Sequence, residues 1–378
     1  MKTMQPVLQV GPFDWAANPL TLEAAQARLD KVKALLRERG WAGLLAYGDR
    51  SEYGTVGYLT NYAPRLGGAI VLVSTEGEPH ILSFEGGRMI DAGKETTWVS
   101  DVRPIGNLAD TIGEWVNAIG GHGTIATSDL GIMSDKVYRD LSALPALAGA
   151  PDATQDVLSV RRSKSDDEVG LLSDAARALG AAEQAVRKYF AAHDSATACL
   201  LAGEAAAMHA GAQDVRILFS VDGGKTLLPA GADTPSGADS LTVYYAIRQW
   251  GYWIDGFVSM ATAPSPTHSA ARGAVEAALG VARAGATSAE LVEAAYRGVD
   301  KPDRHSMFGD GGNGVGTSLV ELPQLDEPDA TLKADDVVSI KVSLPTPEGG
   351  FAFGSAVVRI NDTGADLIWR EQDWTSGP

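Results

Sequence analysis

The pattern of helix and strand signals changes near residue 150, and this change constrains the fold more than any other sequence feature. Before it, strand-like runs alternate with helical periodicity, which is typical of an α/β domain with a mixed sheet. After it, helices and strand-like runs are segregated, which favours an α+β domain with an antiparallel sheet. A chain of 378 residues is also long for a single core. We therefore predict an α/β domain over residues 1–156 and an α+β domain over residues 157–378.

The first domain carries clear local signals. Apolar residues recur at helical spacing from Leu22 to Leu36, and Gly40 follows as a natural C-terminal cap. The pattern predicts a further helix over residues 111–119 and strands over residues 43–47, 69–73, 80–83 and 123–127.

The second domain has two capping boxes. Ser165 and Glu168 begin a long Ala-rich helix that reaches about residue 190, and Thr287 and Glu290 begin another that reaches about residue 296. A third helix is expected over about residues 196–210. Strand-like runs cover residues 215–221, 240–248, 252–259, 337–344 and 354–360.

Charge and composition exclude several classes of function. Lys+Arg 31 against Asp+Glu 48 gives a formal net charge of −17, so bulk electrostatics argue against nucleic-acid or anionic-membrane partners. The single cysteine, Cys199, excludes a disulfide scaffold and a cysteine-based metal site, and we expect it to be a small core residue. No signal peptide or membrane-spanning run is visible, so we expect a cytoplasmic protein.

Three glycines, Gly309, Gly311 and Gly314, formally match the dinucleotide-binding fingerprint. That fingerprint requires a buried strand before it, and residues 300–308 are too polar to form one. We interpret the segment as a glycine-rich loop that lets the backbone approach a ligand or another strand.

Five segments match, in order, motifs that occur together in one protein superfamily. Residues 58–65 (YLTNYAPR) resemble YLTGF-x-PR, and residues 160–168 (VRRSKSDDE) resemble R-x-x-K-S-x-x-E. Residues 251–255 (GYWID) resemble GY-x-x-D, residues 312–323 resemble GHGIG…HE-x-P, and residues 335–341 resemble PGMVFTIE. The chain is thus similar to the creatinase/aminopeptidase P/prolidase superfamily. The resemblance implies a creatinase-like N-terminal α/β domain, a C-terminal pita-bread domain and a homodimer.

The resemblance also implies a site for two divalent metal ions, formed by two Asp, one His and two Glu. By position these ligands correspond to Tyr244, Asp255, Asn313, Lys341 and Ser355, so one carboxylate remains. Divalent ions need several anionic or imidazole ligands, and a lysine ammonium would repel them. We therefore predict no metal and no other cofactor.

Lys341 and Asp255 have opposite charges that would balance inside the former metal cavity. We predict that Lys341 fills part of this volume and pairs with Asp255, and Tyr244 is a candidate for the same network. Residues 339–343 also alternate as in a half-exposed strand, so a solvated Lys341 is the alternative.

The resemblance includes creatinase, a metal-free member that uses a histidine as acid and base to hydrolyse a C–N bond of a guanidino compound. The corresponding histidine, expected after Pro229, is absent, and His305 is the nearest candidate; a surface-loop histidine is the alternative. The catalytic candidates are therefore Lys341, Asp255, Tyr244 and His305.

Candidate substrate-binding residues lie in both domains. By resemblance, Tyr62 and Arg65 would reach the partner's active site in a creatinase-like dimer, where Arg65 would bind a substrate carboxylate; a structural role in the loop after Pro64 is the alternative. The full candidate set is Asn313, Glu321, Ser355, Arg65 and Tyr62.

Two functions follow from these residues. The first is a metal-independent enzyme that acts on a small amino-acid-like or guanidino-like substrate, by C–N bond hydrolysis or a related acid/base lyase or rearrangement step in a specialised pathway. The second is a non-catalytic pseudo-peptidase that binds a small ligand or a protein partner. A charge-balanced pocket favours the first, because random loss of metal ligands would leave mismatched charges. Metal-dependent aminopeptidase activity is not expected.

Overall fold

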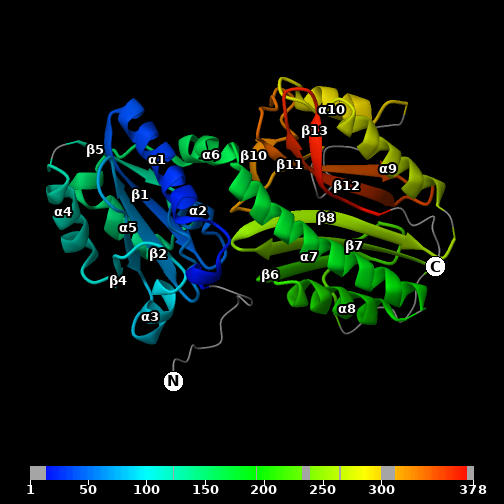
Figure 1. The fold of residues 1–378 in the computed structure, drawn as a ribbon, viewed down its shortest axis with the longest axis horizontal. Helices are drawn as coiled ribbons and strands as arrows, with labels where there is room; N and C mark the ends of the chain where they lie inside the picture. Colours follow the sequence, from blue (N-terminus) through cyan, green and yellow to red (C-terminus); the bar gives the residue numbers. More distant parts are fainter. Residues whose placement is uncertain are drawn as a thin grey trace. The chain divides into compact units, whose positions relative to one another are not determined.

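The chain divides into two compact units, Met1–Arg161 and Arg162–Pro378 (Figure 1). The computed structural model describes residues 14–121, 123–192, 194–231, 239–263, 265–298 and 311–372. The boundary expected after residue 156 falls inside helix α6 (Thr154–Arg162), a helix that was not predicted from the sequence. Val157 of this helix joins the core of the first unit, and Arg161 donates to Thr55 Oγ1 at 3.1 Å, so the division lies at the end of α6.

The first unit contains the predicted mixed sheet, in the order β4-β3-β2-β1-β5. Strand β1 pairs antiparallel with β2 and parallel with β5. The helices cover both faces of the sheet. The consecutive residues Leu44 and Leu45 point to opposite faces: Leu44 belongs to the core that includes Leu36, and Leu45 belongs to a second core that includes Ile112. The strands are β1 (Trp41–Asp49), β2 (Gly68–Ser74), β3 (His80–Ser83), β4 (Val102–Pro104) and β5 (Thr124–Ser128); the α-helices are α1 (Leu22–Arg39), α2 (Gly54–Thr60), α3 (Arg88–Lys94), α4 (Leu108–Ala118) and α5 (Asp135–Ser142).

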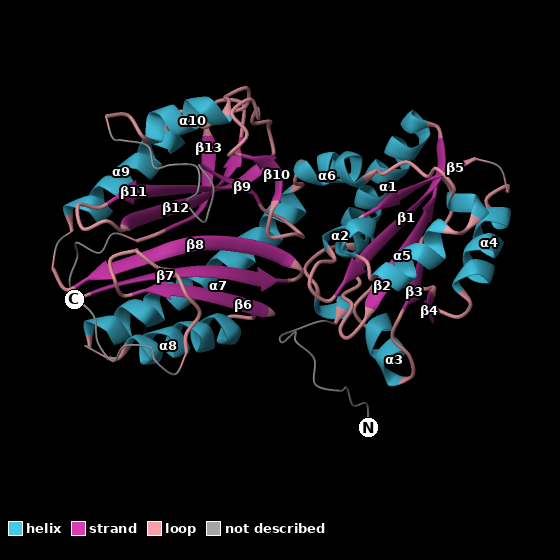
Figure 2. Cartoon of the chain, turned by 180° about the vertical axis from the view of Figure 1, so that it is seen from behind, coloured by secondary structure: helices cyan, strands magenta, loops and turns pink. Residues whose placement is uncertain are grey.

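The second unit begins with helix α7 (Asp166–Ala191), and the predicted capping box of Ser165 and Glu168 is present. Helices α7 and α8 (Ala196–His209) run along the antiparallel sheet β6-β7-β8 (Figure 2). Its strands are β6 (Asp214–Ser220), β7 (Ser240–Gln249) and β8 (Tyr252–Ala261). Cys199 lies in α8 and is fully buried, as expected for a core residue. In the part of the chain that the structure describes, no helix combines the length and apolarity needed to cross a membrane.

A second antiparallel sheet has the order β10-β9-β11-β12-β13. Helices α9 (Pro266–Leu279) and α10 (Ser288–Ala295) pack on one face of it, against a core that includes Ile340 and Val358. The antiparallel arrangement predicted for the second domain is therefore confirmed, although α9, β9, β10 and β13 were not predicted. The strands are β9 (Gly311–Gly314), β10 (Glu321–Gln324), β11 (Val337–Pro345), β12 (Phe351–Ile360) and β13 (Ala365–Arg370).

Gly311 and Gly314 of the glycine-rich segment lie in strand β9, between β10 and β11, and Gly309 lies outside the described residues. Gly312 has φ +108°, and a Cβ atom there would lie 1.8 Å from the carbonyl oxygen of Ser339 on β11. The predicted loop is wrong for Gly311–Gly314, which form a strand, but this contact confirms that a glycine here allows the backbone to approach another strand.

The two sheets of the second unit meet along β8. Trp253 N–H donates to Gly316 O at 2.7 Å, and Phe257 N–H donates to Ser355 Oγ at 2.7 Å. Ser259 N–H donates to the carboxyl group of Glu371, which follows β13. These backbone groups of β8 are therefore satisfied by the second sheet and the segment that leaves it.

Replacing Gly312 with alanine should destabilise the second unit by roughly 3 kcal/mol or more, because the new Cβ atom would collide with the β11 backbone. Gly349→Ala is a matched control, since Gly349 has φ +80° but nothing lies within 4 Å of an added Cβ. Gly349→Ala should lower the free energy of unfolding by only about 1–2 kcal/mol. Urea unfolding measures the stability of both variants. An equal loss of unfolding free energy in the two would contradict the steric argument.

The stability of the second unit should fall as pH rises from 4.5 to about 8. Burial, followed by the charge of Glu183, raises the pKa of Glu371 from 4.5 to about 8. In this window the folded chain holds a proton that the unfolded chain has released, so rising pH favours unfolding. In urea unfolding across this range, Glu371→Gln should flatten the dependence, whereas Glu293→Gln, at an exposed glutamate of α10, should not.

Candidate functional site

Four buried side chains from four strands meet inside the second unit. Lys341 Nζ lies 2.6 Å from Asp255 Oδ2 and donates to Asn313 Oδ1 at 2.8 Å. The hydroxyl of Tyr244 donates to the same Asp255 oxygen at 2.7 Å. We call these four residues the Lys341 cluster. It contains the predicted pairing of Lys341 with Asp255 and includes Tyr244, and the solvated alternative is wrong because Lys341 is only 5% exposed.

The strand alternation explains why Lys341 points into this space. Val338, Ile340 and Val342 of β11 belong to the core that contains α9 and α10, so Lys341 faces the opposite side of the sheet. In the strand register, Lys341 lies opposite Gly311 of β9 and Ser355 of β12.

Asn313 has a defined orientation. Its Nδ2 donates to Gly314 O at 2.7 Å and to Leu319 O at 3.0 Å, which directs Oδ1 to the ammonium of Lys341. Turning the amide over would place its N–H groups against the lysine and lose both bonds. Asn313 therefore positions Lys341, and its predicted contact with substrate stays a prediction.

The electrostatics of the cluster keep Tyr244 protonated. Burial, followed by the charge of Asp255, raises the pKa of Tyr244 well above 10. The phenol therefore acts as a hydrogen-bond donor to Asp255 over the physiological pH range.

Two further polar atoms near the cluster are buried without a hydrogen-bond partner among the described residues: Asp255 Oδ1 and Ser339 Oγ. Ser339 lies opposite Asn313 in the strand register. Asp255 Oδ1 and Ser339 Oγ therefore each retain the capacity to make a further hydrogen bond. Ser339 was not among the predicted site residues, although the alternation of β11 places it on the same face as Lys341.

The donor set of the cluster does not fit the two divalent ions that the superfamily resemblance implies. One carboxylate, a phenol, an amide and an ammonium supply a single formal negative charge, which Lys341 already balances. Among the residues that the structure describes, no group of three or more His, Cys, Asp or Glu side chains could hold a metal ion.

Ser355 and Glu321 make contacts within the protein. Ser355 Oγ accepts from Phe257 N–H, as described above. The carboxylate of Glu321 accepts from Lys164 Nζ at 2.8 Å and from Ser318 N–H at 2.9 Å. These bonds indicate structural roles, and they do not support the predicted contacts of Ser355 and Glu321 with substrate.

Tyr62 and Arg65 are buried inside the first unit. The hydroxyl of Tyr62 donates to Ser83 Oγ at 2.9 Å, and burial raises the pKa of Tyr62 to about 12. Arg65 Nη2 donates to Ala92 O at 3.0 Å, and Arg65 N–H donates to Glu85 Oε1 at 2.6 Å. These contacts favour the structural alternative over a role in a partner's active site. The remaining candidate, His305, lies outside the described residues.

Comparison with known proteins identifies the fold. No protein-family model and no curated protein match the sequence. The structure is similar to X-Pro aminopeptidase from Thermotoga maritima, with a TM-score of 0.74 and 19% identity over 90% of this chain and 96% of that chain. It is also similar to the prolidase from Pyrococcus horikoshii, with a TM-score of 0.74 and 16% identity over 92% and 99% of the two chains.

A third similar structure is the N-terminal domain of the FACT complex subunit SPT16 from chickpea, with a TM-score of 0.67 and 15% identity over 92% and 96% of the two chains. The predicted fold class is therefore confirmed: a creatinase-like α/β unit is followed by a pita-bread unit. An aminopeptidase, a prolidase and a domain of a FACT complex subunit thus share this fold, so activity has to be argued from the site.

Replacing Lys341 with methionine should destabilise the second unit by about 3–5 kcal/mol, because the variant leaves the carboxylate of Asp255 buried without its cation. The double variant Lys341→Met, Asp255→Asn removes both charges and keeps an acceptor for Tyr244. The double variant should recover most of the free energy of unfolding that the single variant loses. Urea unfolding measures both, and a single variant as stable as the wild type would show that the pair is not charged in the folded chain.

Proposed function

We propose that this chain, which has the pita-bread fold, is a metal-independent enzyme that acts on a small amino-acid-like or guanidino-like substrate. The observation that supports this is the buried, charge-balanced Lys341 cluster. Its members stand at positions that correspond to metal ligands in the superfamily that the sequence resembles. By the same resemblance, we propose a homodimer, and the expected cytoplasmic location stays a prediction.

The energetics of a buried ion pair support a functional role. Desolvation of two charges offsets much of their attraction, so apolar residues of similar size often serve stability as well or better. Lys341 is 5% exposed and Asp255 is 1% exposed, so both charges bear this cost. Retaining both charges, together with an unpaired Asp255 oxygen, is therefore better explained by chemistry than by stability.

The proposed reaction is acid/base cleavage of a C–N bond. The ammonium of Lys341 would give its proton to the departing nitrogen, and Asp255 Oδ1 would take a proton from the attacking water. The water oxygen then bonds to carbon, and the nitrogen leaves as an amine. Tyr244 and Asn313 would hold the two reacting groups in position. A related lyase or rearrangement step would use the same proton transfers, and His305 stays a candidate for one of them.

A second function is favoured by a specific observation. The ammonium of Lys341 already has two acceptors, and the hydroxyl of Tyr244 already has one. A cluster satisfied internally in this way also suits a non-catalytic pseudo-peptidase that binds a small ligand or a protein partner. One of the similar structures is described as part of a complex subunit.

Turnover in the presence of a metal chelator tests the proposal. The wild-type chain would be incubated with dipeptides, N-substituted amino acids and guanidino acids, and products would be followed by NMR. We expect product from at least one class of compound. In Lys341→Met, the rate of product formation should fall by roughly 100-fold or more. Lys164→Met is a matched control, because it removes another buried lysine paired with a carboxylate of the same unit.

Three outcomes separate the alternatives. Binding of a small compound without product would reject the enzyme and support the pseudo-peptidase. Product formation that requires an added divalent metal would reject metal independence. If Lys341→Met and Lys164→Met lowered the rate of product formation equally, the loss would reflect a general effect on folding rather than a role of Lys341 in the reaction.

A further inference from the structure

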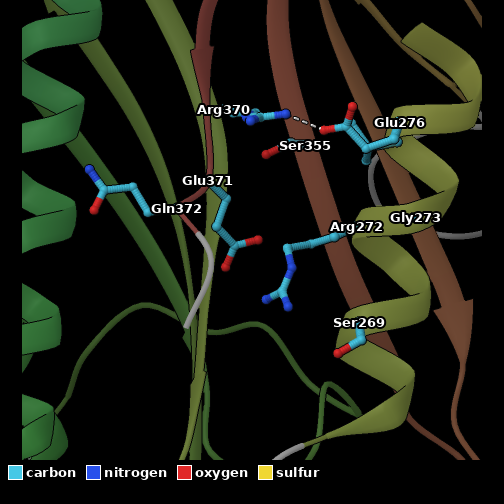
Figure 3. A pocket seen from close by; sticks show the side chains of 9 residues that line it. Ser269, Arg272, Gly273, Glu276, Ser355, Arg370, Glu371 and Gln372 are labelled. Carbon is cyan, nitrogen blue, oxygen red and sulfur yellow. Dashed lines mark hydrogen bonds and ion pairs between the residues drawn. The ribbon is translucent and has the colours of Figure 1, made fainter. Parts of the chain in front are cut away.

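Two cavities formed by the described residues differ in their lining. The cleft beside helix α9 in the second unit is lined by side chains of both charges, including the ion pair of Arg370 with Glu276 (Figure 3). A cavity of about 720 Å³ in the first unit lies between the end of strand β5, helix α5 and the segment that leads from α5 to α6. We call it the β5 cavity. Its volume is typical of sites that enclose a small molecule.

The floor of the β5 cavity is apolar. Met133, Leu141 and Leu147 line it, and each is at most 9% exposed. All three belong to the core on the Leu45 face of the sheet, and Leu130, which also lines the cavity, packs against the same core. Because the core fixes these side chains, the apolar surface is formed before any ligand binds.

One face of α5 forms a wall of the cavity. Asp135, Tyr138 and Ser142 line it at spacings of three and four residues, which places them on the same side of the helix. Tyr138 is 47% exposed, so its aromatic ring is accessible to a ligand. The cavity therefore combines an apolar floor with an aromatic side chain at its wall.

The charged side chains in the lining are negative. Among the described residues that line the β5 cavity, the charged ones are Asp135 and Asp152. Asp135 is paired with Arg139 at 3.1 Å, on the exposed side of α5. Asp152 is bonded to neutral donors: its Oδ1 accepts from Thr154 N–H at 2.9 Å and from the Thr154 hydroxyl at 2.5 Å. The charge of Asp152 is therefore available to a ligand.

The position of Asp152 is fixed by strand β5. Thr127 N–H donates to Pro151 O at 2.9 Å, and Ala153 N–H donates to Thr127 O at 2.7 Å, so the backbone on both sides of Asp152 is bonded to the strand. The two bonds from Thr154 orient the carboxylate through Oδ1. This leaves Oδ2 as an acceptor for a charged donor, and charge-assisted hydrogen bonds are the strong ones.

We propose that the β5 cavity is a second ligand site, which binds a small organic ammonium ion with an apolar body. The ammonium would donate to Asp152, and the apolar body would lie against Leu141 and the ring of Tyr138. A carboxylate ligand would be repelled by Asp152, and a neutral ligand would remove water from Asp152 without supplying a counter-charge. The inference is independent of the chemistry proposed for the Lys341 cluster.

A pair of compounds with opposite charges tests the proposal. The probe is 2-phenylethylammonium, titrated into the full-length chain by isothermal titration calorimetry at constant ionic strength. The comparison compound is 3-phenylpropionate, which has a similar apolar body and a negative charge. We expect the ammonium compound to bind and the carboxylate compound not to bind.

Three variants locate the binding site. Asp152→Asn keeps the Oδ1 acceptor for Thr154 and removes the charge, so it should weaken binding of 2-phenylethylammonium by about 10-fold or more. Asp140→Asn is the matched control, because Asp140 is an aspartate of α5 that pairs with Lys136 and does not line the cavity. It should leave the affinity unchanged. Tyr138→Ala, at an exposed position where folding should be unaffected, should weaken binding by about 3-fold or more.

The proposal is overturned if the wild type does not bind 2-phenylethylammonium, or if 3-phenylpropionate binds equally well. It is also overturned if Asp152→Asn binds the probe as the wild type does. Equal weakening in Asp152→Asn and Asp140→Asn would overturn it too, because the probe would then respond to the net charge of −17 rather than to the cavity. Since catalysis is not measured, failure of the proposed enzyme function would leave this test intact.

Discussion

The ion pair between Lys341 and Asp255, at 2.6 Å, is the interaction on which the centre of the second unit depends. It joins β11 of one sheet to β8 of the other, in a place where neither charge reaches water. Each charge therefore requires the other, and Tyr244 and Asn313 complete the hydrogen bonding. An internal cation and its counter-ion thus stand at two of the positions that the sequence resemblance assigned, as a prediction, to metal ligands.

The rest of the sheet junction follows from the same need to satisfy buried polar groups. Gly316, Ser355 and Glu371 accept hydrogen bonds from three N–H groups of β8. Ser355 therefore has a packing function at a position expected to bind substrate. Glu371 accepts from the β8 backbone and also lines the polar cleft beside α9.

The similar structures identify the fold, whereas the side chains of the Lys341 cluster have to indicate the chemistry. The fold is shared with a prolidase and an X-Pro aminopeptidase, but at 16–19% identity that likeness extends to architecture only. The side chains of the Lys341 cluster do not fit the hard cations that the resemblance implies. Chemistry in this chain, as proposed, would therefore come from an ion pair in a low-dielectric environment.

Local patterns in the sequence determined much of the framework. Capping boxes located α7 and α10, and apolar alternation located β11 and placed Lys341 on the face opposite its core. Strand β9 could not be found this way, because the sequence GGNG has no strand propensity and its conformation comes from pairing with β11. Likewise, no local signal distinguishes Glu371 from a surface glutamate or Arg65 from a ligand-binding arginine. Only the tertiary structure decided these roles, because burial and hydrogen-bond partners are set by residues far away in the chain.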